Sequence, residues 1–163
     1  MTERVTFPLR QEIRWYRWED LLKLGRARLP RFPHFTPEES AVMWGFIKDG
    51  VLRGLWAFDV RLFGKYAYEL ARRGDYFSVR EALLLAKRID ALVDYNDALH
   101  IVEVKRRLLH SAIGQLITYR EMLVEQWQPE RPVLLWAVYA IPDPDVEKIC
   151  KKSGINTYWV RWV

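Results

Sequence analysis

The sequence predicts an α/β domain built on one mixed β-sheet with helices on its faces. The chain has 163 residues, of which 50% are hydrophobic and 29% charged, which is the size and composition of one globular domain. Beyond residue 50, the segments read as strands, helix, strand, helix, strand, an order typical of a sheet flanked by helices. We divide the chain into a basic, aromatic N-terminal extension packed on the core, residues 1–35, and a single domain, residues 36–163.

The first elements are predicted from local capping signals. The extension is expected to contain one short helix near residues 18–24. Thr36 is followed by Pro37 and, three positions after the threonine, by Glu39, which is the pattern of a capping box with proline in the first helical position. We therefore expect a helix that begins here and ends near Lys48.

The middle of the chain predicts strands on either side of an ambiguous stretch. Residues 50–63 are aromatic and β-branched enough for one or two strands, whereas residues 65–86 have helical composition broken by a glycine and give no clear boundaries. Two β-rich runs, residues 88–95 and 98–106, enclose an Asn-Asp pair at residues 96–97 that favours a turn. This arrangement predicts an antiparallel hairpin.

The last third of the chain predicts helix, strand, helix and strand. Apolar residues recur at helical spacing over residues 111–127, and residues 133–140 form a fully apolar run of strand character. Asp143 and Pro144 predict the start of a second helix, which ends at a lysine-rich turn with a glycine, and residues 155–163 form the last strand.

The predicted hairpin brings three ionisable side chains together. If residues 96–97 form the turn, Asp90 lies directly opposite Glu103. Side chains alternate along a strand, so Asp90, Glu103 and Lys105 project from the same face of the sheet. The opposite face is then expected to be core, formed by Ile89, Ala91, Val93, Ala98, Val102 and Val104, with His100 and Tyr95 as its polar residues.

Two opposed carboxylates beside an amine suit the hydrolysis of a phosphodiester. Opposed Cβ atoms lie about 4.5 to 5.5 Å apart, so Asp90 and Glu103 can ligate one Mg²⁺ or Mn²⁺ ion, with the Val104 carbonyl as a further candidate ligand. Such an ion would activate water and absorb charge on the phosphate. Lys105 would orient or deprotonate that water and offset the developing negative charge. Three arginines are candidate contacts to the phosphate backbone: Arg88, Arg106 and Arg107.

In these residues the sequence resembles the PD-(D/E)XK nuclease superfamily. Its signature is an acidic residue on one strand, here Asp90, followed by (D/E)-x-K on the next, here the segment 103–105. Gln115 and Tyr119 resemble the Q-x-x-x-Y helix of the RecB-like branch, in which both residues face the active site. No proline precedes Asp90, where the name of the superfamily places one. The resemblance covers about residues 88–160.

The resemblance implies a fold, an activity and a set of catalytic residues. The fold is a restriction-endonuclease-like core of order αβββαβ, and the activity is Mg²⁺- or Mn²⁺-dependent hydrolysis of DNA in repair, recombination or replication. The implied catalytic residues are Asp90, Glu103, Lys105, Gln115 and Tyr119. The early helix of such nucleases often adds a glutamate, for which Glu38 and Glu39 are candidates, but both also suit first-turn capping, which we favour. Asp94 shares the face of Asp90 and is an outside candidate.

Composition bears on partners and location. The net charge of +5 and the pI of about 9.4 favour a polyanionic partner such as DNA. The single cysteine allows no intrachain disulfide, argues against the iron–sulfur exonucleases of the RecB-like branch, and fits a cytoplasmic setting. The first residues contain no apolar signal core, and the longest apolar run, residues 133–141, is too short to span a bilayer, so no membrane is expected.

Two other functions stay open at this point. A nucleic-acid-binding or assembly protein can retain a nuclease-like fold without turnover, although the intact set of Asp90, Glu103 and Lys105 speaks against it. A purely structural α/β protein would carry these charges incidentally. Endonuclease and exonuclease activity both remain open, and a homodimer is an expectation drawn only from nucleases of similar fold that cut both strands.

Overall fold

The computed structural model describes residues 11–28 and 35–161 of the chain. Its strands are β1 (Tyr16–Arg17), β2 (Leu55–Leu62), β3 (Lys87–Tyr95), β4 (Ala98–Arg107), β5 (Val133–Ile141) and β6 (Ile155–Trp159). Its helices are α1 (Trp18–Leu24), α2 (Pro37–Asp49), α3 (Lys65–Arg72), α4 (Tyr76–Leu85), α5 (Ser111–Trp127) and α6 (Pro144–Lys152), with a 3₁₀ turn at Arg26–Arg28. No helix within the described residues is both long and apolar enough to cross a membrane.

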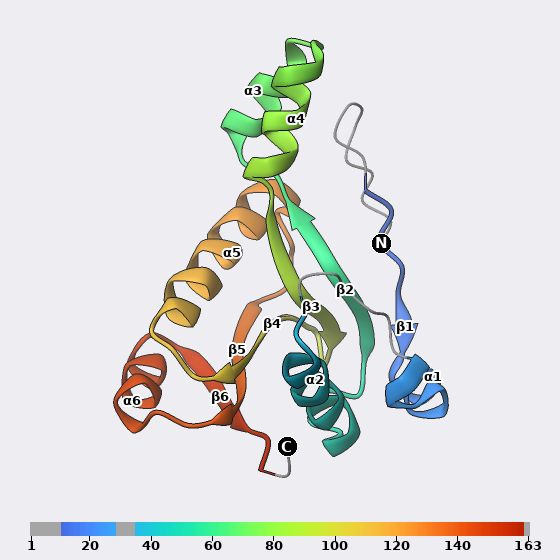
Figure 1. The fold of residues 1–163 in the computed structure, drawn as a ribbon, viewed down its shortest axis with the longest axis vertical. Coiled ribbons are helices and arrows are strands. Elements are labelled where there is room, and N and C mark those ends of the chain that lie inside the picture. Colours follow the sequence, from blue (N-terminus) through green and yellow to red (C-terminus); the bar gives the residue numbers. More distant parts are fainter. Residues whose placement is uncertain (1–10, 29–34, 162–163) are drawn as a thin grey trace.

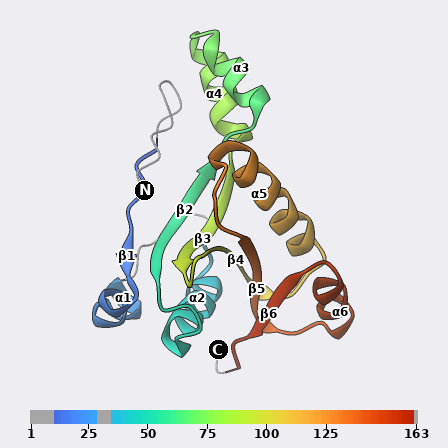
Figure 2. The same cartoon turned by 180° about the vertical axis from the view of Figure 1, so that it is seen from behind.

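The six strands form one open mixed sheet in the order β1-β2-β3-β4-β5-β6 (Figure 1). Neighbours are antiparallel from β1 to β4 and parallel from β4 to β6. Helices α5 and α6 pack on one face of the sheet, and α1 and α2 pack on the other (Figure 2). Each face has one apolar cluster, which its two helices cover. The chain is thus an α/β protein with a mixed sheet flanked by helices, as its sequence predicts.

The predicted capping box begins α2. The Thr36 hydroxyl accepts a hydrogen bond from the Glu39 amide at 3.1 Å, and the Glu39 carboxylate accepts one from the Thr36 amide at 3.0 Å. The helix ends at Asp49, where Gly50 takes a left-handed conformation with φ of 68°. Both ends of α2 therefore follow from local sequence. The Glu39 carboxylate caps the helix, whether or not it also takes part in chemistry.

The predicted hairpin forms with the predicted register. Asn96 and Asp97 both have positive φ, 50° and 56°, as a two-residue type I′ turn requires. The pairing runs from Tyr95 opposite Ala98 to Ala91 opposite Val102. Asp90 and Glu103 follow as the next residues of the two strands, so the hairpin carries both carboxylates to the same level of the sheet.

The described part of the N-terminal extension packs on the sheet. Strand β1 pairs with β2, and the indole of Trp18 donates a hydrogen bond to the Ile47 carbonyl at 2.8 Å. Leu21 is fully buried in the cluster beneath α2. The remaining parts of the extension, residues 1–10 and 29–34, lie outside the described residues.

The ambiguous stretch folds as two helices that project from the body of the molecule (Figures 1 and 2). Helices α3 and α4 meet at Gly74, whose φ of 73° suits a glycine, and they share a small core of their own. That core is formed by Phe63, Ala67, Leu70, Ala71 and Ala82. At the base, the Lys65 ammonium lies 2.9 Å from the Glu125 carboxylate of α5. We call residues 65–85 the α3–α4 arm.

Candidate active site

A pocket of about 320 Å³ opens where β3 begins and β4 nears its end, beside α5 and the start of α2. The structure brings all of the residues predicted to be catalytic into its wall. They are Asp90, Glu103, Lys105, Gln115 and Tyr119, and Val104 lines the pocket with them. Residues from four separate elements thus converge on one cavity, which is the arrangement a small-ligand or catalytic site requires.

Asp90 is held by the backbone of the neighbouring strand. Its side chain is buried, at 6% exposure, and its Oδ2 accepts a hydrogen bond from the Val104 amide at 2.8 Å. Because an amide and a carbonyl of the same strand residue point to the same side, the Val104 carbonyl also faces the edge where Asp90 lies. The side chain of Asp90 is therefore oriented by a residue that directly follows Glu103.

Glu103 is more deeply buried, at 3% exposure, and only one of its oxygens has a donor. Its Oε1 lies 3.0 Å from the Lys105 ammonium, whereas its Oε2 is buried without a hydrogen-bond partner. The Gln115 Oε1 is also buried without one. A buried acceptor without a donor is costly, so the pocket has an excess of oxygen acceptors that a cation or protons would relieve.

The electrostatics follow from this crowding. Burial, and then the charge of Asp90, raise the pKa of Glu103 to about 8, although Lys105 acts in the opposite direction. Burial disfavours the charge on Lys105, but the contact with Glu103 and the proximity of Asp90 and Glu39 outweigh it, so the pKa of Lys105 is raised. Lys105 is consequently a cation at neutral pH.

Helix α5 presents Gln115 and Tyr119 to the pocket from consecutive turns, as their spacing of four predicts. Tyr119 is buried, and burial together with the charges of Glu103 and Asp90 raises the pKa of its hydroxyl. The phenol therefore stays protonated and can act as a hydrogen-bond donor toward an anion.

The pocket also includes residues outside the predicted catalytic set. Glu39 lines it while its carboxylate caps α2, so the capping prediction is confirmed and the glutamate also borders the site. Phe35, just before the cap, lines the same side. Ala86 and Lys87 enter from the segment that joins α4 to β3, together with Arg88, which was predicted to contact nucleic acid. The capping pattern locates Glu39, but only the packing of α2 on β4 brings it to the site.

One predicted orientation is wrong. Ile89 was expected on the face of Ala91 and Val93, but it packs in the opposite cluster, beneath α5. The alternation of side chains switches at Asp90, which lies across from Asp59 of β2, a residue with a left-handed φ of 53°. The switch leaves Ile89 and Leu92 on the same side of the sheet, with Asp90 at the point of change.

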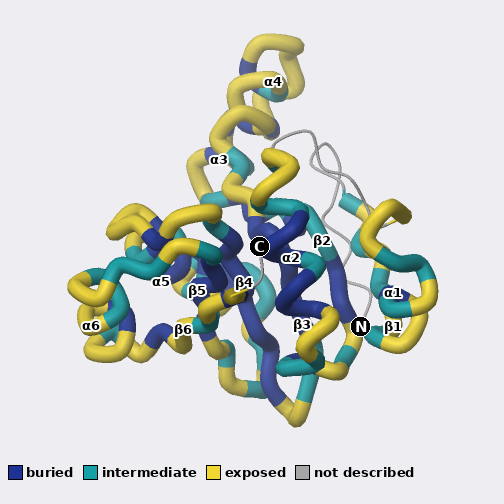
Figure 3. The backbone as a smooth tube through the Cα atoms, turned by 60° about the horizontal axis from the view of Figure 1, so that its bottom comes forward, coloured by how far each residue is buried: buried dark blue, intermediate teal, exposed yellow. Residues whose placement is uncertain are grey.

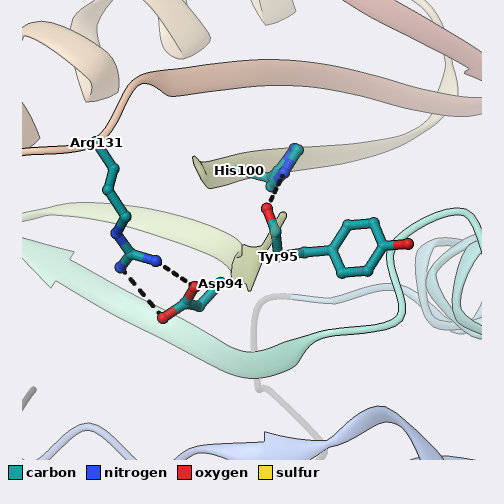
Figure 4. A network of polar contacts seen from close by, with 4 residues as sticks. All are labelled: Asp94, Tyr95, His100 and Arg131. Atoms are coloured by element: carbon teal, nitrogen blue, oxygen red, sulfur yellow. Dashed lines mark hydrogen bonds and ion pairs between the residues drawn. The ribbon is translucent and has the colours of Figure 1, made fainter. Parts of the chain in front are cut away.

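Three other candidates lie apart from the pocket wall. Arg106 and Arg107 are exposed at the end of β4. Asp94 points away, because both of its oxygens accept hydrogen bonds from the Arg131 guanidinium, one of them at 3.1 Å (Figure 4). Asp94 therefore has a structural partner of its own near the turn, which accounts for its charge without a ligand.

His100 lies in the core, as expected, with both ring nitrogens in use. Its Nε2 is 3.0 Å from the Tyr95 carbonyl (Figure 4), and its Nδ1 accepts a hydrogen bond from the Trp136 indole at 3.0 Å. Burial lowers the pKa of His100. The neutral ring thus satisfies one donor and one acceptor inside the protein and has no role in the pocket.

The chain has no match among known protein families, curated proteins or solved structures. Within the described residues, no group of three or more His, Cys, Asp or Glu side chains is arranged to hold a metal ion. Any ion in the pocket would therefore rely on two carboxylates, backbone or amide oxygens and water, which are the hard oxygen ligands that Mg²⁺ prefers.

Proposed function

We propose that this chain is a metal-dependent nuclease that hydrolyses DNA phosphodiester bonds with Mg²⁺ or Mn²⁺. The observation that carries the proposal is the buried, acceptor-rich pocket in which Asp90 and Glu103 stand beside Lys105. The buried Glu103 Oε2 and Gln115 Oε1 have no donor, which is costly in an isolated protein. They become favourable when a divalent cation occupies the space between them.

The order of elements supports membership of the PD-(D/E)XK superfamily. From α2 onward the chain runs α2, β2, β3, β4, α5 and β5, which is the αβββαβ order expected of a restriction-endonuclease-like core, with the α3–α4 arm inserted between its first two strands. Gln115 and Tyr119 of α5 border the pocket, as in the RecB-like branch. These likenesses favour a role in DNA repair, recombination or replication.

Asp90 and Glu103 would hold the ion, with the Val104 carbonyl as a further oxygen ligand on the same side as Asp90. The donor set fits the group, because the unpartnered oxygens are hard ligands of the kind that Mg²⁺ and Mn²⁺ bind. When bound, the ion supplies positive charge that acidifies a water and stabilises negative charge on the phosphate.

The protein's own groups would do the rest. The Lys105 ammonium offsets the charge that develops on the phosphate and orients the attacking water, since its raised pKa keeps it protonated. The Tyr119 hydroxyl and Gln115 amide position the phosphate from the helix side. Arg88 at the rim, and Arg106 and Arg107 at the end of β4, would bind the flanking backbone phosphates.

Cleavage of end-labelled duplex, single-stranded and branched DNA tests the proposal. The wild type is expected to cut with Mg²⁺ or Mn²⁺ and to be inactive in EDTA, and Asp90→Asn and Lys105→Met are each expected to lose at least about a hundredfold in rate. Asp94→Asn makes the same chemical change as Asp90→Asn on the same strand and should cut normally. DNA that is bound tightly but never cut would instead support a non-catalytic nucleic-acid-binding or assembly protein.

A further inference from the structure

The α3–α4 arm exposes more large apolar side chains than its small core explains. Tyr76, Phe77 and Leu84 of α4 are 67%, 80% and 79% exposed, and the arm is largely exposed along its length (Figure 3). The inner face of α4, with Ser78 and Ala82, is buried against α3. The apolar residues therefore form an outward ridge that the helix does not need for its own packing.

The ridge is interleaved with positive charge. The arm contains four basic and three acidic residues, and Lys87 and Arg88 follow it at the start of β3. Arg72 and Arg73 lie at the tip beside the exposed pair Tyr76 and Phe77, whose rings meet edge to face at 5.6 Å. Arg80 follows one turn later. Exposed rings between arginines suit a partner that offers both stacked bases and phosphates.

The base of the ridge is the rim of the pocket. The residues that directly follow α4, from Ala86 to Arg88, line the pocket, and Asp90 comes two positions later. At the start of α3, the Lys65 ammonium forms an ion pair with the Glu125 carboxylate of α5, the helix that carries Gln115 and Tyr119. A polymer that lies in the pocket and continues past Arg88 would therefore run along the arm.

We propose that the α3–α4 arm is a strand-separating wedge that directs the pocket to branched DNA, in which a duplex opens into two single strands. The proposal rests on the proposed nuclease function and names the substrate class of that site. The apolar ridge of Phe77 and Leu84 contacts the faces of the unpaired bases at the branch point, in the way that apolar wedges enter base steps. Arg72, Arg73 and Arg80 bind the diverging phosphates.

The length of the arm sets where the cut falls. Helix α4 has ten residues, which corresponds to about 15 Å between the rim of the pocket and the tip at Tyr76 and Phe77. Successive nucleotides of one strand are about 3.4 Å apart along the helix axis. A branch point held at the tip therefore places a phosphate roughly four or five nucleotides away in the pocket.

Cleavage of two substrates of identical sequence tests this inference. One is a paired duplex and the other a duplex with two unpaired arms, both end-labelled so that the cut site is mapped. The wild type is expected to cut the branched substrate about tenfold faster, four or five nucleotides from the branch, as loss of a stacking contact is worth about that factor. Phe77→Ala/Leu84→Ala should lose the preference and still cut the paired duplex at the wild-type rate.

The controls separate the wedge from the nuclease. Ile149→Ala, an exposed apolar residue on α6, should keep the preference. Binding of both substrates is also measured by fluorescence anisotropy in EDTA, in an Asp90→Asn background. If the protein binds branched DNA preferentially through Phe77 and Leu84 but never cuts it, the wedge proposal is supported and the nuclease proposal is refuted.

Two results would overturn the wedge while leaving the nuclease intact. One is cleavage in which Phe77→Ala/Leu84→Ala keeps the preference for branched DNA, or in which the wild type has none. The other is a dimer in analytical ultracentrifugation that Phe77→Ala/Leu84→Ala converts to monomer, because the ridge would then bind a second copy of the chain.

Discussion

Replacing Asp90 by asparagine is expected to stabilise the metal-free protein while it abolishes DNA cleavage. At pH 9 the Glu103 carboxyl, with a pKa of about 8, is charged, so two buried carboxylates face one Lys105 ammonium. The asparagine oxygen can still accept the hydrogen bond from the Val104 amide. Its NH₂ group supplies a donor for the Glu103 Oε2, which has none.

The expected gain in stability equals the cost of leaving the Glu103 Oε2 without a donor. A buried acceptor without a donor costs about 1–3 kcal/mol, so Asp90→Asn should raise the free energy of unfolding by about that amount. For a chain of this length, that corresponds to an increase in Tm of roughly 2–12 °C. Because the folded pKa of Glu103 lies above the ordinary carboxyl value of 4.5, the cost is absent below about pH 4.5 and grows up to about pH 8. The gain should therefore shrink at pH 5.

Thermal unfolding in EDTA, followed by circular dichroism at pH 9 and pH 5, measures this gain. Asp94→Asn is the matched control, because its carboxylate is paired with Arg131 and partly exposed. That control is expected to lose about 0.5–1 kcal/mol at both pH values. If Asp90→Asn is instead less stable than the wild type at pH 9, the two carboxylates are not in conflict and the argument for a cation between them fails.

Three further predictions concern stability alone. The pKa of His100 is lowered by burial, so below about pH 6.5 the imidazole is protonated in the unfolded chain but still neutral in the folded protein. The wild type should therefore lose stability as the pH falls below this value. Urea unfolding between pH 7 and 5 should show a shallower loss for His100→Gln; equal slopes would contradict this account. A Cβ on Gly54 would lie 1.9 Å from the Asp94 carbonyl oxygen, so Gly54→Ala should cost at least about 3 kcal/mol. Gly114→Ala, in an open position on α5, should gain about 1 kcal/mol, and a loss in the same unfolding assay would show that the helix needs this glycine.

The elements that the sequence predicts correctly have local causes. The hairpin forms around residues 96–97 because both central residues accept positive φ, and the strand period then sets which residues meet. The capping box determines the start of α2 through hydrogen bonds between Thr36 and Glu39, three residues apart. Helical spacing places Gln115 and Tyr119 on one side of α5, whereas their position at the pocket was expected from the resemblance to the Q-x-x-x-Y helix. In each case a few neighbouring residues carry the information.

What the sequence could not predict depends on contacts between distant residues. The left-handed conformation of Asp59 coincides with the switch of faces at Asp90 and Ile89, and no turn signal marks it in the sequence. Glu39 reaches the pocket only through the packing of α2 on the sheet. The α3–α4 arm has ordinary helical composition, so its projection from the body is set by where β2 ends and β3 begins.

Binding of Mn²⁺ to the purified protein tests the central claim most directly. Titration followed by electron paramagnetic resonance should show one bound ion per chain in the wild type and in Asp94→Asn. In Asp90→Asn and Glu103→Gln the same titration should show the ion free in solution, because each variant removes a carboxylate ligand. Mn²⁺ binding that is absent in the wild type, or unchanged in both variants, would contradict the assignment of this pocket as a metal site.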